Sequence, residues 1–227
     1  MKRAFLVPAA AVLLAGPAAA QEADNWNFAF GAATDYRSKG LSKTQGDPYA
    51  YAAIEWQSDS QVFYAGLDTA RVKQSFGSDQ EIGARAGYRP EAWGYSFDFS
   101  TLYRYHPGAV SGADNEHWEF GADASRSIGP VSGRLRVQYS PDNSGSSGAF
   151  TYVEGRVGYR IEPKLRVTAA LGHRYTEDSI DYTAWNAGLN YRVTDNADVD
   201  FRWYDTDKRS RGAQFEEAAV LAVNFSF

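Results

Sequence analysis

A strict alternation of apolar and polar residues runs along most of the chain, and it limits the fold more than any other feature. Leu165, Val167 and Ala169, for example, alternate with Arg166 and Thr168. A period of two residues is typical of strands that bury one face. After the first twenty residues no apolar period of 3.6 residues is sustained. The sequence therefore predicts an all-β fold.

The alternating runs are separated by clusters of Gly, Pro, Asp, Asn and Ser, which are typical of turns. Twelve runs are long enough to be strands. A chain of 227 residues fits one all-β domain of this size. The predicted strands lie near residues 25–36, 49–57, 61–71, 80–89, 94–106, 115–125, 130–140, 149–160, 164–175, 181–193, 197–206 and 216–227.

The connections between these strands alternate in length. Long connections follow most odd-numbered strands, at residues 38–48, 72–79, 107–114, 141–148 and 207–214. Short connections follow the even-numbered strands, and the short connection at 177–180 breaks the rule. Outer-membrane barrels show this alternation, with long loops outside the cell and tight turns in the periplasm.

The N-terminus has the features of a secretory signal. Lys2 and Arg3 precede a short apolar run, and the small residues Ala18–Ala20 follow it. A run this short does not reach the roughly 20 apolar residues of a spanning helix. We therefore expect export through the Sec pathway, a cleaved signal peptide at residues 1–20 and a barrel domain at 21–227.

Composition excludes several classes of function. The chain has no cysteine, which excludes disulfides, thiolate zinc sites and a cysteine nucleophile. A net charge of −5 argues against a nucleic-acid partner. The acidic run Asp195–Asp200 lacks the glycine and the distal glutamate of a calcium loop. The sequence predicts no metal and no cofactor.

Two features favour a membrane barrel over a soluble one. Leu221, Val223, Phe225 and Phe227 share one face of the last strand, and a terminal Phe there resembles the signal read by the outer-membrane barrel-assembly machinery. Tyr and Trp recur near strand ends, as in the aromatic girdles at the two lipid interfaces. Because open sheet edges do not occur in hydrocarbon, the strands must close on themselves. We expect a transmembrane, antiparallel, up-and-down β-barrel of about twelve strands that contacts outer-membrane lipid and lipopolysaccharide.

The inward faces of the predicted strands carry many arginines and acids. Guanidinium groups stay charged in a narrow lumen and bind carboxylates in a two-pronged manner. In one hypothesis the arginines select small anionic or zwitterionic solutes. In the other, the pairs neutralise one another and plug the lumen. The lumen-lining candidates are Arg85, Arg104, Arg134, Arg136, Arg156, Arg174, Arg192, Arg202, Asp98, Glu119, Glu154 and Asp200.

One segment, from Thr34 to Thr44, reads T-D-Y-R-S-K-G-L-S-K-T, and Asp47-Pro48 follow shortly after it. It resembles the S-D-Y-R-x-R-G-x-S-Q-T opening of the TorF family of porin-like proteins. The resemblance implies an outer-membrane location and a porin-like role. The matching positions are Asp35, Tyr36, Arg37, Gly40, Ser42 and Thr44, whereas Ser38, Lys39 and Lys43 depart from the pattern.

The place of this segment in the barrel stays open at the level of sequence. Arg37, Lys39 and Lys43 fold inward as a constriction in one interpretation. In a second, they contact lipopolysaccharide phosphates outside the barrel. In a third, the segment is a solvated loop in which Gly40 makes the turn.

An outer-membrane enzyme acting on lipid is the rival function. Phospholipase-type barrels place a serine nucleophile two positions after a histidine base, but Gly108, Glu119 and Tyr175 occupy those positions after the three histidines. His106, His117 and Glu119 remain an acid/base candidate, although loop-proximal polar residues are the better interpretation. The sequence predicts no enzyme and favours a porin-like channel for passive diffusion of small hydrophilic solutes. A structural barrel with a plugged lumen is the third hypothesis.

Overall fold

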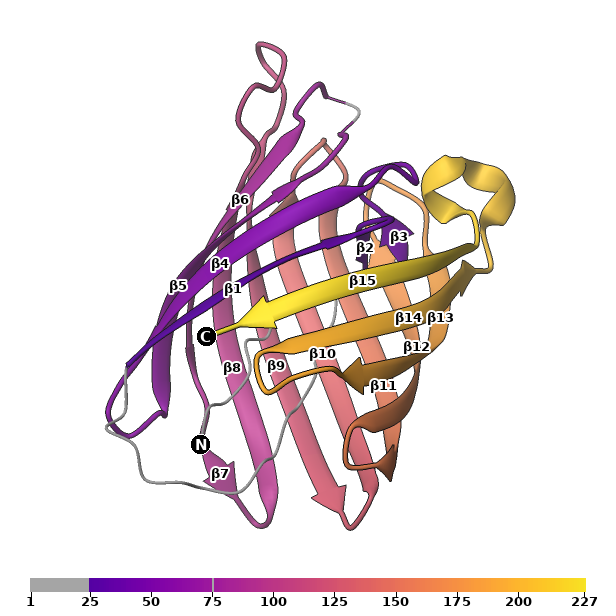
Figure 1. Cartoon of the computed structure of the whole chain (residues 1–227). Coiled ribbons are helices and arrows are strands. Elements are labelled where there is room, and N and C mark those ends of the chain that lie inside the picture. Colours follow the sequence, from indigo (N-terminus) through magenta and orange to yellow (C-terminus); the bar gives the residue numbers. More distant parts are fainter. Residues whose placement is uncertain (1–24, 75) are drawn as a thin grey trace.

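A computed structural model gives the structure of residues 25–74 and 76–227. Twelve of its strands form a closed antiparallel barrel (Figure 1), as the alternation predicts. The predicted signal peptide lies outside the described residues. The barrel strands are β1 (Trp26–Ala33), β4 (Tyr49–Gln57), β5 (Phe63–Arg71), β6 (Gln80–Tyr88), β8 (Tyr95–Tyr105), β9 (Glu116–Ile128), β10 (Val131–Asn143), β11 (Gly148–Glu162), β12 (Leu165–Thr176), β13 (Tyr182–Arg192), β14 (Ala197–Thr206) and β15 (Ala218–Ser226).

Each barrel strand pairs with the next one along the chain, and the first and last strands close the ring. β1 pairs with β15 in a register that sets Phe30 opposite Phe225. Three two-residue strands lie outside this ring order: β2 (Arg37–Ser38) and β3 (Leu41–Ser42) pair with each other, and β7 (Glu91–Ala92) pairs with β8.

In the described residues, helical structure is confined to two short 3₁₀ turns, η1 (Arg209–Arg211) and η2 (Ala213–Phe215), in the loop before β15. Among the residues that the structure describes, no helix is long and apolar enough to cross a membrane.

The alternation of the sequence becomes an apolar outside and a polar inside. Large apolar side chains such as Phe28, Leu135 and Phe201 point outward, each about half exposed. Exposed Trp, Tyr, Phe, Leu and Val side chains occur on every strand of the ring. Soluble monomers rarely expose apolar patches of more than a few hundred Å². An outer face of this extent suits a lipid environment.

The two ends of the barrel differ. One end, here the long-loop end, carries the connections at residues 34–48, 72–79, 106–115 and 207–217, and the other, the short-turn end, carries turns such as 129–130 and 163–164. The predicted long connection at 141–148 is shorter than expected, because β10 continues past Pro141 through a β-bulge between Ser140 and Asn143.

Close backbone approaches require glycine at several strand positions, and Gly188 is one of them. A Cβ on Gly188 of β13 would lie 2.7 Å from the Phe201 carbonyl oxygen and 2.9 Å from Arg202 Cβ. A Cβ on the exposed Gly155 of β11 would meet no atom within 4 Å. The two glycines therefore form a matched pair for substitution.

We expect Gly188→Ala to destabilise the barrel by about 1–3 kcal/mol, because two strands must move apart to accept the methyl group. Gly155→Ala should leave stability unchanged or raise it slightly. The measurement is the urea midpoint of the refolded protein in detergent micelles. Equal midpoints for the two variants would show that β13 and β14 do not pack as described.

Candidate functional site in the barrel lumen

The segment Asp35–Thr44, which includes β2 and β3, folds into the barrel, and we name it the inward hairpin. Tyr36, Arg37 and Thr44 are each at most 4% exposed. Three interpretations of this segment were open: an inward fold, contact with lipopolysaccharide, or a solvated loop. In the structure the segment folds inward, and its basic residues lie inside the barrel.

The carboxylate of Asp35 organises the inward hairpin. It accepts hydrogen bonds from the Arg37 guanidinium, from Ser42 Oγ at 2.5 Å and from Thr44 Oγ1 at 2.8 Å. Gly40 makes the turn with a φ of +87°, a conformation that favours glycine. The residues that carry the TorF resemblance therefore bond mainly to one another.

The tip of the inward hairpin rests on β13. A Cβ on Gly40 would lie 2.2 Å from the Ala184 Cβ, so only glycine fits there. Tyr182 Oη donates to the Lys39 carbonyl at 3.0 Å. Leu41 packs against a small apolar cluster of Tyr182, Ala184 and Phe215. The hairpin thus bridges the lumen from β1 to β13.

Two lysines tie the inward hairpin to further strands. Lys39 Nζ lies 2.9 Å from Glu119 Oε1 on β9, and Lys43 Nζ is paired with Glu81 on β6. Glu81 is fully buried and also forms an ion pair with Arg104, whose Nη1 lies 2.7 Å from Glu81 Oε1. Burial lowers the pKa of Lys39 to about 8, although the Glu119 carboxylate opposes this shift. The hairpin narrows the lumen toward the long-loop end.

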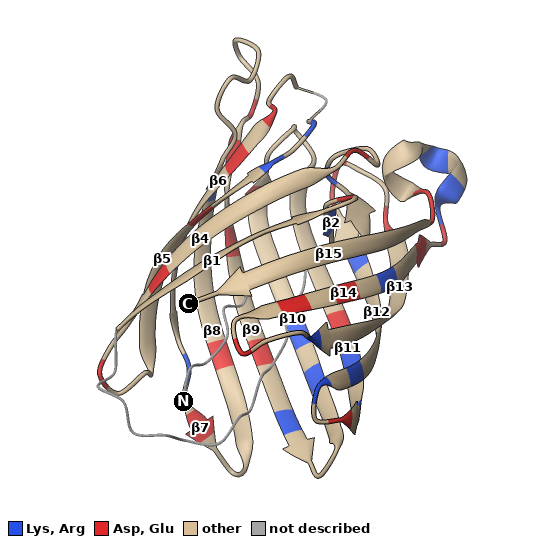
Figure 2. Cartoon of the chain, viewed as in Figure 1, with Lys and Arg blue, Asp and Glu red and all other residues tan. Residues whose placement is uncertain are grey.

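A group of basic side chains lines one side of the lumen, from the level of the inward hairpin toward the short-turn end. Figure 2 shows basic segments on β10 to β13. Cations concentrated on one wall attract and orient anions in a narrow passage. We name this group the arginine wall; its members are Arg134 and Arg136 on β10, Arg156 on β11, Arg174 on β12 and Arg192 on β13.

Acids neutralise only part of the arginine wall. Arg136 Nε lies 2.8 Å from Asp123, Arg134 Nη2 lies 2.6 Å from Glu154, and Arg156 is 3.4 Å from the same Glu154. Within the described chain, buried Nε atoms without a hydrogen-bond partner occur in Arg134, Arg156, Arg174 and Arg192. An unpaired buried donor is costly, so water or a solute is expected to bind these atoms.

The opposite side of the lumen carries acids that are closely paired with basic groups. In the ring order, β4, β5 and β6 lie across from β10 to β13. Arg89, in the turn after β6, bonds Glu55 at 2.8 Å and Asp98 at 3.1 Å, and Arg104 Nη1 reaches Asp68 at 3.0 Å. The lumen thus has one side whose charges cancel in pairs and one basic side with spare donors, and this difference gives a transverse field.

The structure places all lumen-lining candidates on inward faces of the strands. Arg85 lies on β6, Arg104 and Asp98 on β8, Glu119 on β9 and Glu154 on β11, while Arg202 and Asp200 form a 3.0 Å pair on β14. Phe225 and Phe227 lie on the outer side, where they stack on Phe30 with ring centroids 5.1 and 6.0 Å away.

Sequence reasoning missed part of the site. Glu55 and Arg89 form a buried pair, although the alternation around Ile54 and Trp56 already marks Glu55 as inward. No sequence signal pointed to Tyr182 as the seat of the hairpin tip. That contact joins residues 143 positions apart.

The two histidines of the acid/base candidate do approach each other. The His106 and His117 rings are 6.0 Å apart, and His117 Nε2 lies 3.2 Å from Glu119. In residues 25–74 and 76–227 neither ring hydrogen bonds to a hydroxyl group. No cluster of metal-ligating side chains is found in that part of the chain.

Comparisons with known proteins agree on the fold. Residues 18–224 match the model of a family described as "Bacterial protein of unknown function (Gcw_chp)". No curated protein matches the sequence. The KdgM porin matches 88% of this chain and 99% of its own length at 11% identity, with a TM-score of 0.61. The NanC porin matches 88% and 98% at 10% identity, with a TM-score of 0.60. At such identities the similarity is one of fold.

Asp35→Ala should release the inward hairpin without unfolding the barrel. Hydrogen bonds to a charged group stabilise by about 1.5–3 kcal/mol, so we expect amide exchange in residues 36–44 to accelerate by at least about tenfold. Hydrogen exchange with mass spectrometry measures this.

Asp47→Ala is the matched control, because the Asp47–Lys73 pair is exposed and 3.4 Å long. The control should leave exchange in the hairpin unchanged. Slow exchange in Asp35→Ala would mean that the strand contacts alone hold the hairpin.

Proposed function

The chain belongs to the Gcw_chp family of bacterial proteins, whose function is unknown, and we propose that it is a porin-like channel of the outer membrane. Small hydrophilic solutes diffuse through it passively, and anions are preferred. The observation that carries the proposal is a closed barrel whose lumen holds arginine donors without protein partners.

The surface supports the location. The apolar outer face faces outer-membrane lipid, the short-turn end faces the periplasm, and the long-loop end faces lipopolysaccharide. The predicted signal peptide and Sec export, the terminal aromatics Phe225 and Phe227 as a signal to the barrel-assembly machinery, and the TorF resemblance of the inward hairpin agree with this placement.

The similar folds support the solute class. A structure titled "KdgM porin in complex with disordered oligogalacturonate" matches 88% of this chain at 10% identity, with a TM-score of 0.62. That ligand is a polyanion. An arginine wall with spare donors suits negatively charged solutes here as well.

Passage requires no covalent step. A solute that enters past the inward hairpin exchanges part of its hydration shell for guanidinium groups along the arginine wall. The pairs with Asp123 and Glu154 limit the net charge of the wall, so that binding stays weak and the solute leaves again.

The first prediction concerns ion selectivity in planar bilayers. Refolded protein should open in discrete steps and favour anions. A unit charge about 7 Å from a passing ion in water contributes about 0.6 kcal/mol. The double variant Arg136→Ala/Arg156→Ala should therefore lower the anion-to-cation permeability ratio, read from reversal potentials, at least about threefold.

Arg71→Ala is the matched control, because Arg71 is exposed at the outer side of β5. This substitution also removes a guanidinium charge, but one outside the lumen, so the ion selectivity should stay unchanged. A folded barrel that stays electrically silent would contradict the channel and favour the plugged barrel.

Selectivity should also depend on pH through Lys39. Lys39 faces Glu119 and His117 of β9, Arg174 of β12 and Tyr182 of β13, and Lys43 lies beside it. Burial lowers its pKa to about 8. Below that pH, Lys39 is charged and cancels Glu119; above it, the constriction loses one positive charge.

The anion preference should therefore decrease as the pH rises from about 7 to about 9. Lys39→Arg stays charged over this range and should remove the step. The same decrease in the Lys39→Arg variant would assign the titration to another group.

A further inference from the structure

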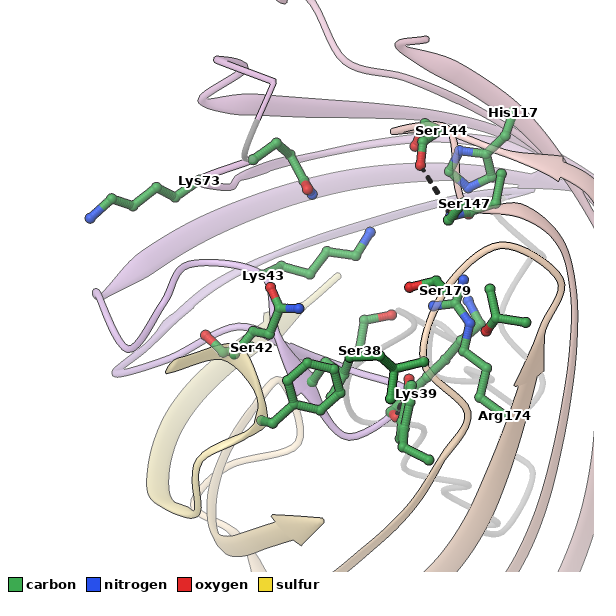
Figure 3. A pocket seen from close by; sticks show the side chains of 18 of the residues that line it. Ser38, Lys39, Ser42, Lys43, Lys73, His117, Ser144, Ser147, Arg174 and Ser179 are labelled. Carbon is green, nitrogen blue, oxygen red and sulfur yellow. Dashed lines mark hydrogen bonds between the residues drawn. The ribbon is translucent and has the colours of Figure 1, made fainter. Parts of the chain in front are cut away.

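A cavity of about 200 Å³ opens beside the inward hairpin at the long-loop end (Figure 3). At about 30 Å³ for each molecule, it has room for roughly seven waters. A solute with a similar number of heavy atoms fits this space. The inward hairpin and the loops after β10, β12 and β14 form its walls.

Basic side chains outnumber acidic ones in the cavity lining, and Lys39, Lys43 and Lys73 are each paired with an acid. Lys39, Lys43, Lys73 and Arg174 line the cavity, and Glu119 is the acidic group among the lining residues. Figure 3 shows Lys43 on one side of the cavity and Arg174 on the other. Arg174 is held in place over the Phe150 ring, 4.1 Å from its centroid. Such an arrangement attracts a carboxylate and gives it a planar partner.

Two polar atoms of the cavity lining are buried without a partner in the described chain, and they point to a ligand. They are Arg174 Nε and His117 Nδ1. The His117 side chain is 3% exposed, and its Nε2 lies 3.2 Å from the Glu119 carboxylate. Because the proton then lies on Nε2, Nδ1 is an acceptor and calls for a ligand O–H group.

The remaining lining is rich in groups that bind hydroxyls. Ser144, Ser147, Ser179 and Thr176 supply side-chain oxygens, and Asn143 donates to Ser147 Oγ at 2.6 Å. Hydroxyl and amide groups both donate and accept, as sugar-like hydroxyls do. Orthophosphate offers fewer O–H donors than a solute with several hydroxyl groups, and therefore suits this lining less well.

We propose that this cavity is a binding site for a small carboxylate that carries several hydroxyl groups. Arg174 and Lys43 bind the carboxylate, and His117 Nδ1 and the serines bind the hydroxyls. The role of this site as a capture step before passage rests on the proposed channel function. Binding of the ligand to the cavity does not depend on that function.

The test is calorimetric titration of the folded protein in detergent with three four-carbon probes. Threonate has the carboxylate and the hydroxyls, erythritol has hydroxyls alone, and butyrate has the carboxylate alone. Threonate should bind at least about tenfold more tightly than either, since a hydrogen bond to a charged group contributes about 1.5–3 kcal/mol.

Variants locate the site. Arg174→Met and His117→Phe should each weaken threonate binding at least about tenfold. Arg71→Met, outside the lumen, should bind like the unchanged protein. Resistance of each barrel to unfolding by SDS without heating shows that it is folded.

Several outcomes overturn the proposal. Equal binding of threonate and butyrate, or tighter binding of inorganic phosphate, would show that hydroxyls are not recognised. If Arg71→Met weakens threonate binding as much as Arg174→Met does, the binding reflects non-specific attraction to positive charge and not a defined site. If the protein conducts ions but threonate neither binds to it nor blocks its current, the binding site is contradicted and the channel function still stands. Threonate binding by an electrically silent barrel would keep the site and remove the channel.

Discussion

The lumen depends on one buried carboxylate. Asp35 accepts from Arg37, Ser42 and Thr44, and these bonds bend the chain into the inward hairpin. A buried carboxylate without partners is strongly disfavoured, so hairpin and carboxylate stabilise each other. Because the hairpin lies inside, Lys39 and Lys43 reach acids on β9 and β6. The constriction, the cavity beside it and the pH dependence of Lys39 all follow from this arrangement.

Below the hairpin, the lumen is shaped by arginine. A lysine at these positions would present a strongly hydrated point charge on a flexible stem, whereas guanidinium keeps its charge and divides its donors among several acceptors. Arg134 and Arg156 share Glu154, and both keep an unpartnered Nε. The acids hold the guanidinium groups in place and cancel part of their charge, while the spare donors remain in the lumen. One set of side chains thus supports the wall and, in the proposed channel, offers the donors that would bind the solute.

The sequence was sufficient to predict the strands and the faces, because both are local. A strand needs only its own alternation to separate an outward Leu165 from an inward Arg166, and the closed ring follows because open sheet edges do not occur in hydrocarbon. The sequence alone leaves three alternatives for the inward hairpin, because its place depends on contacts such as Lys39 with Glu119, which are 80 residues apart. The inward position of Glu55 can be predicted from its place in the alternating strand. Its partner Arg89 lies in a turn, where alternation does not indicate the direction of a side chain.

The same physics makes the proposed binding and the proposed passage compatible in this barrel. A deep site made of charges alone would hold an anion too firmly for transport. Here the cavity beside the hairpin combines Arg174 with Glu119 and neutral hydroxyl groups, so that a ligand is recognised by its shape and donors as much as by its charge. The rest of the arginine wall, which lies below the cavity, is also partly neutralised. A solute that leaves the first group for the second therefore exchanges one set of partial contacts for another, and no single step requires it to give up a fully satisfied charge.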